Sequence, residues 1–389
     1  MQVELSPHLD AVRGRARDVA NSVTSKYAAQ HDRDYSMPME TMAALKEVDL
    51  LTISAPRRLG GMETGIVNMV DPLAFLLVIE ELARVDMSAA HCFQVHSHTS
   101  QLLASTATKE QQDRWFAPTF ERGGILSWTG GEPGRTARGQ YNMVSEATRR
   151  SDGFELNGIK QYGTNASVGA WNVVTVSLPN MTPSDGFLMV LIPHDAKGFT
   201  VDEAWWRPTG MRACVSPKLI LKDLFVPDQD ILQGPGFYPK SKLGARWHLG
   251  FSASHLGAAQ GMLDFAVDYL PKRGTAGNPH SQRAIGEMSM RIAAARNMVY
   301  QAAALWQAKK VAEAEQYSLM AKLYAISTAE WMINETIRIV GSTALLETFP
   351  LNRFMRDIHV HSTHANLHNT AQSIGKAVLG MNFDATEQQ

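Results

Sequence analysis

The chain has 389 residues, enough for two or three domains with buried cores, and its 44% hydrophobic and 19% charged content is ordinary for a globular protein. The formal net charge of −1, without a block of Lys and Arg, argues against a nucleic-acid partner, and no run of about 18 apolar residues exists to span a membrane. Two distant cysteines, Cys92 and Cys214, and an N-terminal segment without an apolar core predict a protein of the reducing cytoplasm, with neither a disulfide framework nor a signal peptide.

Residues 1–120 are predicted to form a helical domain. Apolar residues recur at helical spacing from Leu9 to Val23, and a second helix is predicted after Pro38. A third opens at Asp71–Pro72, where a proline suits the first helical turn. These segments predict several amphipathic helices before the first strand.

The helix predicted after residue 85 carries three histidines, His91, His96 and His98. A histidine titrates near neutral pH and can give or take a proton there. Most histidines in such a helix are structural or exposed. We expect His96 to be the one that points into a cleft.

Residues 121–235 change to a β pattern. Short apolar runs, such as 173–176 and 187–192, are separated by the turn signals Asn157–Gly158 and Asp185–Gly186. A β-domain between helical domains differs from the strand–helix alternation of a dinucleotide-binding fold. The glycine fingerprint of nicotinamide binding is also missing from the sequence.

Residues 236–389 are predicted to be helical again. Small and apolar residues alternate from 247 to 270, and amphipathic patterns cover 288–305, 319–340 and 366–379. Helices of this kind with short connections predict a bundle.

Near the end of the chain, four histidines fall within ten residues: His359, His361, His364 and His368. The segment is open to three interpretations: a polar helix and loop with solvated imidazoles, a metal site, or a proton-transfer site. No Cys or Glu lies in it to complete a familiar ligand set, so we expect no metal. The phrases that precede it favour proton transfer.

Those phrases resemble the acyl-CoA dehydrogenase superfamily. They are Glu-Leu-Ala-Arg-x-Asp-x-Ser-Ala-Ala at 81–90, Ile-Val-Gly-Ser-Thr at 339–343 and Phe-Pro-Leu-Asn-Arg-Phe-Met-Arg-Asp at 349–357. The resemblance covers almost the whole chain. It implies an α+β fold with an N-terminal helical domain (1–120), a middle β-barrel or sandwich domain (121–235) and a C-terminal four-helix bundle (236–389).

Three phrases of the middle domain resemble the family's platform for the flavin ring: 126–134 with its Glu-Pro-Gly turn, 158–165 with Gly-x-Lys-x-x-x-Thr, and 210–216 with Gly-x-Arg-x-x-x-Ser. Small residues and hydroxyls there suit a flavin, which needs donors at its polar edge and a close backbone. The first phrase has two residues more than the family pattern. The resemblance implies that the ring is held by Ser127, Trp128, Thr129, Gly163, Thr164 and Asn165.

The family's phosphate-holding residues are matched at the far end of the chain. Arg273 completes a Tyr-x-x-x-Arg phrase whose arginine usually holds a flavin phosphate across a subunit interface. Gly341 and Ser342 stand where the family has two glycines, and the Cβ of Ser342 restricts the approach of the backbone to the cofactor. Weak flavin retention and a homotetramer are therefore expected.

The Arg-Asp phrase decides between branches of the family. The dehydrogenases follow it with a catalytic Glu, but this chain has no Glu or Asp between Asp357 and Asp384. The spacing Arg-Asp-x-x-x-His-x-x-His instead resembles the two-component flavin monooxygenases, a branch that includes dibenzothiophene monooxygenase. His361 and His364 would then be catalytic, with His96 as a further candidate.

The resemblance implies a reaction in which a transient NAD(P)H-dependent reductase supplies reduced flavin, FADH2 or FMNH2. O2 then gives one oxygen atom to a small aromatic, heteroaromatic or amine substrate. Trp205 and Trp206 would form a wall of the substrate pocket or part of an ordinary core. An acyl-CoA dehydrogenase or oxidase with a relocated base, and a non-enzymatic scaffold, stay as alternatives.

Overall fold

The computed structural model describes residues 4–121 and 124–386. The N-terminal part contains α1 (Pro7–Val19), α2 (Ser25–Asp34), α3 (Met39–Glu47), α4 (Pro72–Ala83), α5 (Met87–Thr106) and α6 (Lys109–Glu121). A π-helical turn, Ala20–Thr24, joins α1 to α2. Local sequence sets the helix starts, because Ser6 caps α1 ahead of Pro7 and Asp86 caps α5 through the Ser88 N–H.

The middle part is a curled sheet. It contains β1 (Ile125–Thr129), β2 (Glu146–Arg149), β3 (Gly153–Lys160), β4 (Gly169–Ser177), β5 (Phe187–Pro193), β6 (Phe199–Asp202), β7 (Lys218–Pro227) and β8 (Ile231–Leu232), with a short helix α7 (Arg135–Arg138) after β1. The strand order is β6-β7-β3-β2-β4-β5-β8, and β1 pairs with β4 in parallel. Strands that are buried on both faces, such as β5, read as continuous apolar runs.

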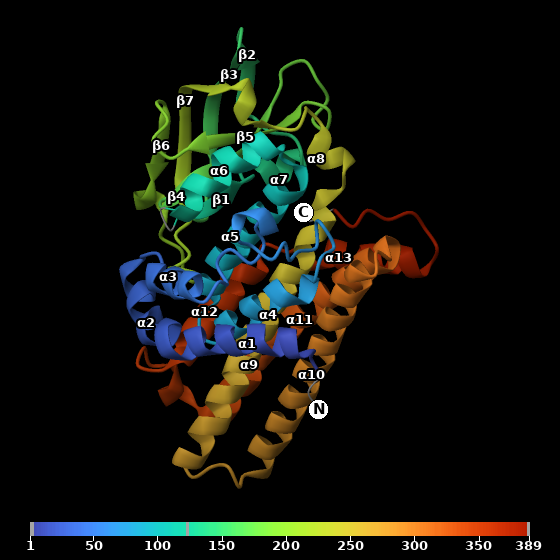
Figure 1. Ribbon diagram of the computed structural model, residues 1–389. Helices are drawn as coiled ribbons and strands as arrows, with labels where there is room; N and C mark the ends of the chain where they lie inside the picture. The colour runs from blue at the N-terminus through green and yellow to red at the C-terminus, as the bar shows by residue number, and fades with distance from the viewer. Residues whose placement is uncertain (1–3, 122–123, 387–389) are drawn as a thin grey trace.

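The C-terminal part contains α8 (Phe237–Lys240), α9 (His248–Lys272), α10 (Pro279–Gln307), α11 (Val311–Val340), α12 (Pro350–Ser362) and α13 (Leu367–Val378). In Figure 1 the sheet lies above the helices, and α9 and α10 project as a long hairpin below them. The predicted α+β class, with helical ends and a middle sheet, is confirmed. None of the helices in the described ranges is both long and apolar enough to cross a membrane.

The two turn signals of the β-domain had different outcomes. Asp185–Gly186 closes the predicted turn between β4 and β5, where the Gly186 N–H donates to the Thr182 carbonyl at 2.8 Å. Asn157–Gly158 does not turn; it forms a bulge inside β3, where the register against β7 shifts between Leu156 and Gly158. Gly158 has φ +154° and its missing Cβ leaves room for Ser145, so the glycine serves close packing.

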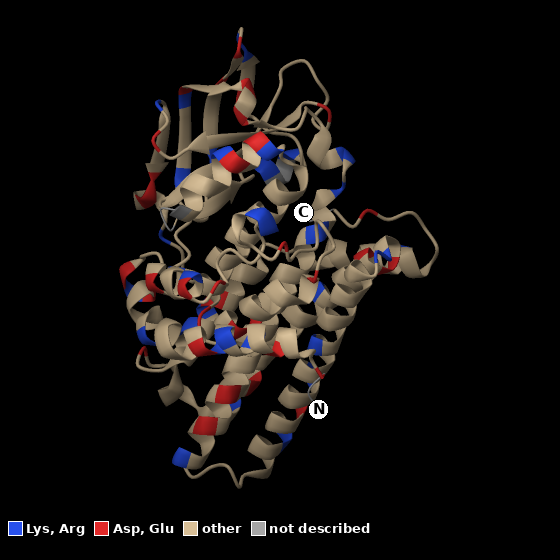
Figure 2. Ribbon diagram, in the orientation of Figure 1, with Lys and Arg blue, Asp and Glu red and all other residues tan. Residues whose placement is uncertain are grey.

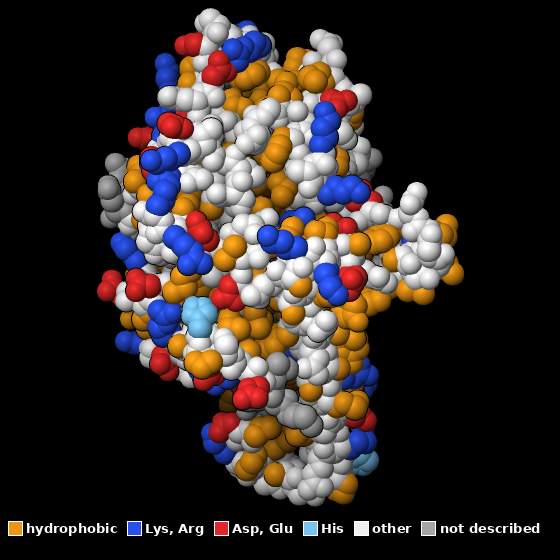
Figure 3. Space-filling model, turned by 45° about the vertical axis from the view of Figure 1, so that its right-hand side comes forward, with side chains coloured by type: hydrophobic (Ala, Val, Ile, Leu, Met, Phe, Trp, Pro, Cys, Tyr) orange, Lys and Arg blue, Asp and Glu red, His pale blue; other side chains and the backbone are white. Residues whose placement is uncertain are grey.

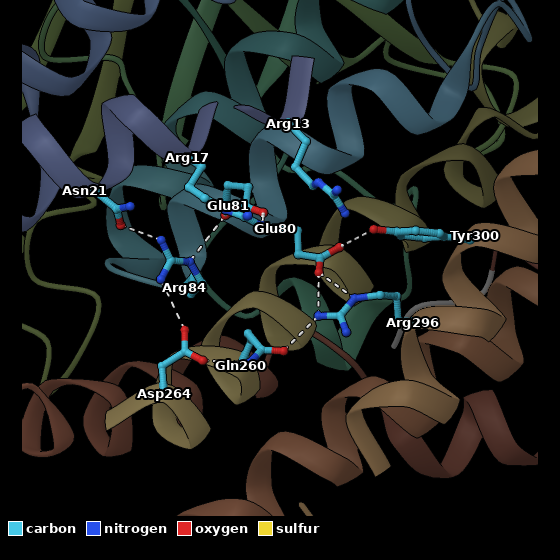
Figure 4. A pocket seen from close by; sticks show the side chains of 10 residues that line it. All are labelled: Arg13, Arg17, Asn21, Glu80, Glu81, Arg84, Gln260, Asp264, Arg296 and Tyr300. Atoms are coloured by element: carbon cyan, nitrogen blue, oxygen red, sulfur yellow. Dashed lines mark hydrogen bonds and ion pairs between the residues drawn. The ribbon is translucent and has the colours of Figure 1, made fainter. Parts of the chain in front are cut away.

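Positions of basic and acidic residues are interspersed along the ribbon in Figure 2. Some of them form a network around a cavity of about 340 Å³ between α1, α4, α9 and α10 (Figure 4). Glu80 accepts from Arg296 Nε at 2.9 Å and from Tyr300 Oη at 3.1 Å, while Glu81 accepts from Arg17 Nη2 at 2.6 Å. Because its acids and arginines pair with one another, this network fastens the N-terminal helices to the C-terminal bundle.

Candidate active site

A cleft of about 260 Å³ lies where α5, the start of α9 and the loop after β1 meet. Aromatic, histidine and amide side chains dominate its walls. Its lining includes His91, Gln94, Val95 and His98 from α5, Trp128, Gly130, Gly131 and Arg135 from β1 and the following loop, and Tyr238, Trp247, Phe251 and His364 from the C-terminal part. The cleft joins all three parts of the chain.

Helical periodicity explains which histidines of α5 reach the cleft. His91 and His98 are seven residues apart, which places them two turns apart on one face of the helix. His96 lies on another face. Its Nδ1 accepts the Leu126 N–H at 3.0 Å, so its Nε2 carries the proton and donates to the Leu51 carbonyl at 3.0 Å.

His96 therefore ties α5 to β1 and to the segment after α3. Both of its ring nitrogens are occupied by backbone, and burial lowers its pKa to about 4. This geometry does not support the proton-transfer role expected for His96. His91, which the sequence singled out only as one of three, occupies the cleft in its place.

His361 lies behind His91. It is fully buried on α12, and its Nε2 is 3.0 Å from His91 Nδ1. Burial, and then the neighbouring histidines, hold the pKa of both imidazoles well below the ordinary value, so both are neutral. The remaining nitrogen of His361, Nδ1, is buried without a partner.

That unpartnered nitrogen fixes the tautomers. A buried N–H without an acceptor is rarer than a bare lone pair, so the proton of His361 belongs on Nε2, which donates to His91 Nδ1. The proton of His91 is then on Nε2. His91 thus presents an N–H donor to the cleft, and His361 holds it in that state.

His364 follows the end of α12 and completes the lining. Its Nδ1 lies 3.3 Å from the His361 carbonyl, and its ring centroid is 5.8 Å from that of His91. His364 is an exposed residue, but desolvation by the protein around its ring lowers its pKa, against the opposing hydrogen bond to the His361 carbonyl. His359 and His368 are exposed and do not line the cleft. Within the described residues, no group of three or more His, Cys, Asp and Glu side chains is placed to hold a metal ion.

The residues expected to hold the flavin ring divide into two sets. Trp128 and Thr164 line the cleft, and Thr164 Oγ1 is 2.8 Å from Ser216 Oγ. Ser127 and Thr129 alternate with Trp128 along β1 and therefore face the other side, where both hydroxyl oxygens are buried without a partner.

Asn165 and Gly163 have structural surroundings. Asn165 Nδ2 donates to the Cys92 carbonyl at 2.8 Å and to the Leu126 carbonyl at 3.1 Å, which fastens the sheet to α5. A Cβ at Gly163 would lie 3.1 Å from the Leu219 side chain. The groups that fit the polar edge of a flavin ring are the Thr164 hydroxyl and the backbone of Gly130 and Gly131, and a Cβ at Gly131 would meet the Gln161 carbonyl at 2.7 Å.

A buried ion pair, which the sequence phrases did not reveal, supports this loop. Lys160 Nζ is fully buried and donates to Glu132 Oε1 at 2.9 Å and to the Thr175 carbonyl at 2.7 Å. Desolvation lowers the Lys160 pKa to about 8. Desolvation would raise the pKa of Glu132, but the charge and hydrogen bond of Lys160 and the Val144 and Ser145 N–H groups bring it below the ordinary value.

Arg273, Gly341 and Ser342 lie together, far from the cleft. Arg273 Nη1 donates to the Val340 carbonyl, and a Cβ at Gly341, whose φ is +80°, would lie 2.6 Å from the same nitrogen. Trp247 caps the start of α9 and Arg273 its end, so 25 residues separate them. At 1.5 Å per residue that is about 37 Å, which no single flavin in one chain would span.

Trp205 and Trp206 do not line the cleft. Trp206 is 7% exposed and donates from Nε1 to the Arg212 carbonyl at 3.1 Å. The ring of Trp205 lies 5.3 Å from that of Tyr162, which does line the cleft. The pair therefore supports Tyr162 from outside.

The models of one protein family match most of the chain. The acyl-CoA dehydrogenase family matches it with its N-terminal domain over residues 6–122, its middle domain over 132–224 and its C-terminal domain over 249–369. The mitochondrial short-chain specific acyl-CoA dehydrogenase of Mus musculus is 28% identical over 92% of this chain and 86% of its own.

Two solved structures have a fold similar to that of this chain. Butyryl-CoA dehydrogenase from Megasphaera elsdenii superposes with a TM-score of 0.88 at 22% identity, covering 97% of this chain and 100% of the other. Dibenzothiophene monooxygenase (TdsC) from Paenibacillus sp. A11-2 superposes with a TM-score of 0.84 at 20% identity, covering 97% and 99%. At these identities the likeness concerns the fold, which both kinds of enzyme share.

Proposed function

The chain belongs to the acyl-CoA dehydrogenase superfamily, a family of flavin-dependent oxidoreductases, and from this premise we propose that it is a two-component flavin monooxygenase. One observation carries the proposal. The described residues that line the cleft include three histidines and an arginine, but no Asp or Glu. A dehydrogenase of acyl thioesters needs a base for the proton next to the carbonyl, and the resemblance places a carboxylate in that role.

The cleft residues suit proton control in a dry pocket. The bound flavin supplies the redox chemistry with O2. The Nε2–H of His91 would donate to an oxygen atom of a molecule bound in the cleft, and His361 would keep that proton in place through the 3.0 Å bond to Nδ1. His364, at the mouth, exchanges protons between the cleft and the solvent. The aromatic side chains Trp128, Trp247 and Phe251 exclude water.

Two features favour a flavin that is bound across subunits. Thr164 and the Gly130–Gly131 backbone face the cleft, whereas Arg273 lies about 37 Å away along α9. A second copy of the chain would therefore supply the arginine for each flavin, as in a homotetramer. Hydrophobic side chains gather on the projecting helices in Figure 3, and Val267 and Met290 there are 52% and 65% exposed.

An acyl-CoA dehydrogenase is the second candidate, and the identity to the mouse enzyme favours it. His364 or His91 would then have to remove the proton. Their lowered pKa values make them weaker bases than an ordinary histidine. The short aromatic cleft also suits a ring better than an extended acyl chain.

The test supplies the protein with NADH, a flavin reductase, FMN or FAD and isotopically labelled O2, together with a panel of indoles, phenols and thiophenes. We expect a product that contains one labelled oxygen atom and forms only when this protein is present. A parallel anaerobic arm adds butyryl-CoA to the oxidised flavoprotein. Bleaching of the flavin by butyryl-CoA, together with unlabelled substrates throughout the panel, would refute the monooxygenase and support the dehydrogenase.

A further inference from the structure

Arg135 is the arginine that the described residues contribute to the cleft lining. Within the described residues its hydrogen bonds go to backbone carbonyls: Nε and Nη2 donate to Gln140 at 3.0 and 2.7 Å, and Nη1 donates to Gly130 at 3.1 Å. Among the described residues no carboxylate forms an ion pair with it, although Arg135 lines the cleft. An arginine keeps its charge in a protein, so this charge is open to a ligand.

The nearby carboxylate, Glu132, already has two cationic partners. Glu132 is bonded by Lys160 at 2.9 Å and by Arg138 Nη2 at 3.0 Å. Arg135 and Arg138 of the loop and Lys160 at the end of β3 therefore place three cations and one anion, Glu132, in or beside this end of the cleft. Its field attracts a negative group, and a low-dielectric wall strengthens that attraction.

A second donor faces the same space. A Cβ at Gly130 would lie 3.5 Å from Arg135 Nη1 and 3.5 Å from Trp128 Nε1, so the two nitrogens flank the room that the glycine leaves open. The indole N–H of Trp128 has no hydrogen-bond partner among the described residues, and Trp128 lines the cleft. An indole nitrogen is a donor only, which suits an acceptor such as a carboxylate oxygen.

The rest of this end of the cleft is aromatic. The ring of Trp128 lies 5.4 Å from that of Tyr238 and 5.9 Å from that of Trp247. Flat apolar walls beside one positive group are complementary to a planar ring that carries one negative group.

We infer that the substrate of this cleft is a small aromatic acid whose carboxylate pairs with Arg135 and accepts a hydrogen bond from Trp128 Nε1. The inference rests on the proposed function for the identification of the cleft as the substrate site. Arg135 sets the orientation, since the carboxylate end must lie at the loop after β1. The ring then extends toward His91 and His364.

Binding tests this assignment without any turnover. Benzoate and its neutral match benzamide are titrated into the full-length protein saturated with FMN, by calorimetry and by the fluorescence of the cleft tryptophans. We expect benzoate to bind at least ten-fold more tightly than benzamide. Arg135→Gln should abolish this preference, because it lowers the affinity for benzoate at least ten-fold and leaves the affinity for benzamide unchanged. Arg135→Lys should retain part of the preference for benzoate.

Matched variants separate the competing roles of Arg135. Arg138→Gln removes a charge from the same loop but leaves Glu132 bonded to Lys160, so benzoate binding should stay within about two-fold of the wild type. Trp128→Phe keeps the ring and deletes the donor, and should weaken benzoate about three- to ten-fold. Circular dichroism and the Tm confirm that each variant is folded.

Three outcomes would overturn the inference. Equal affinities for benzoate and benzamide, or no binding of either at millimolar concentration, would show that the cation selects no carboxylate. An equal loss of affinity for both ligands in Arg135→Gln would show that Arg135 only stabilises the loop. A loss of FMN affinity in that variant, with riboflavin unchanged, would assign the cation to the flavin phosphate. If no labelled product forms in the oxygenation test but the preference for benzoate is intact, only the proposed function is refuted.

Discussion

Replacing Asp357 by asparagine is expected to stabilise the folded protein above neutral pH. Asp357 is 1% exposed on α12, and its Oδ1 accepts the Met211 N–H at 2.5 Å, which docks the 210–216 segment on the helix of His361. Burial, reinforced by the buried carboxyl of Asp86, raises the Asp357 pKa from 3.8 to about 7. The Met211 N–H and the charge of Arg353 oppose this shift without cancelling it.

Linkage gives the sign and the magnitude. Between pH 3.8 and about 7 the folded carboxyl keeps its proton while the unfolded one loses it, so the stability that depends on Asp357 falls as the pH rises and levels off above the folded pKa. Each pH unit in this window costs about 1.4 kcal/mol, which gives about 3 kcal/mol between pH 5 and pH 7. Because part of the shift comes from the charge of the nearby Asp86 carboxyl and the site relaxes, we expect about 1–3 kcal/mol. For a chain of this length that corresponds to about 1–4 °C in Tm.

The assay is the Tm of the wild type and of Asp357→Asn at several pH values from about 5 to 8. The advantage of the variant should grow with pH and become constant above about 7, because the asparagine still accepts the Met211 N–H. Asp223→Asn is the matched control, since Asp223 is exposed and its difference from the wild type should not depend on pH in this range. A difference that is flat with pH, or a variant that is least stable at pH 8, would mean that Asp357 is ionised in the fold throughout.

Four further outcomes are expected. Replacing His91 or His364 by Ala should lower turnover about 10²–10⁴-fold, whereas His368→Ala should keep it, and an equal loss at all three positions would point to a structural role for the cluster. The acid limb of the pH–rate profile should lie below the ordinary histidine pKa, because burial lowers that of His91; a limb above pH 7 would contradict the assignment. Light scattering should give a homotetramer that purifies largely colourless, and Arg273→Ala should weaken FMN further without changing the Tm of the flavin-free protein; a monomer, or tightly held stoichiometric flavin, would refute the shared site. Glu80→Gln should lower the free energy of unfolding by about 1–3 kcal/mol, because it leaves the half-buried Arg296 guanidinium without its anion. An unchanged Tm would show that Glu80 does not stabilise the contact between the N-terminal helices and the C-terminal bundle.

Much of the fold could be predicted from the sequence because its signals are local. The Asp71–Pro72 signal starts a helix at Pro72, and short apolar runs bounded by turn residues mark strands such as β5 within a few positions. The family phrases then predicted, in chain order, a flavin platform, the Arg-Asp segment and an arginine for the flavin phosphate. The monooxygenase proposal itself began with a local absence, the missing carboxylate after Asp357.

The face that each side chain presents was less predictable, even where the period was known. The spacing of seven between His91 and His98 indicated a shared face, but only the packing of α5 against β1 and α9 shows that this face lines the cleft and that His96 does not. Asn157–Gly158 is a turn signal by composition. It became a bulge because β3 continues along β7 and the glycine lets Ser145 approach.

The sequence by itself determined the order of the helices and strands, the family and the residue types available for chemistry. Tertiary structure alone decided the contacts: His361 behind His91, Glu132 against Lys160, Arg135 against the Gly130 carbonyl, and Arg273 at the far end of α9. The physical reason is that helix periods and caps depend on neighbours within about four residues. The charge state and role of a buried group depend instead on desolvation and on partners from distant parts of the chain, such as His91 and His361, which lie 270 positions apart.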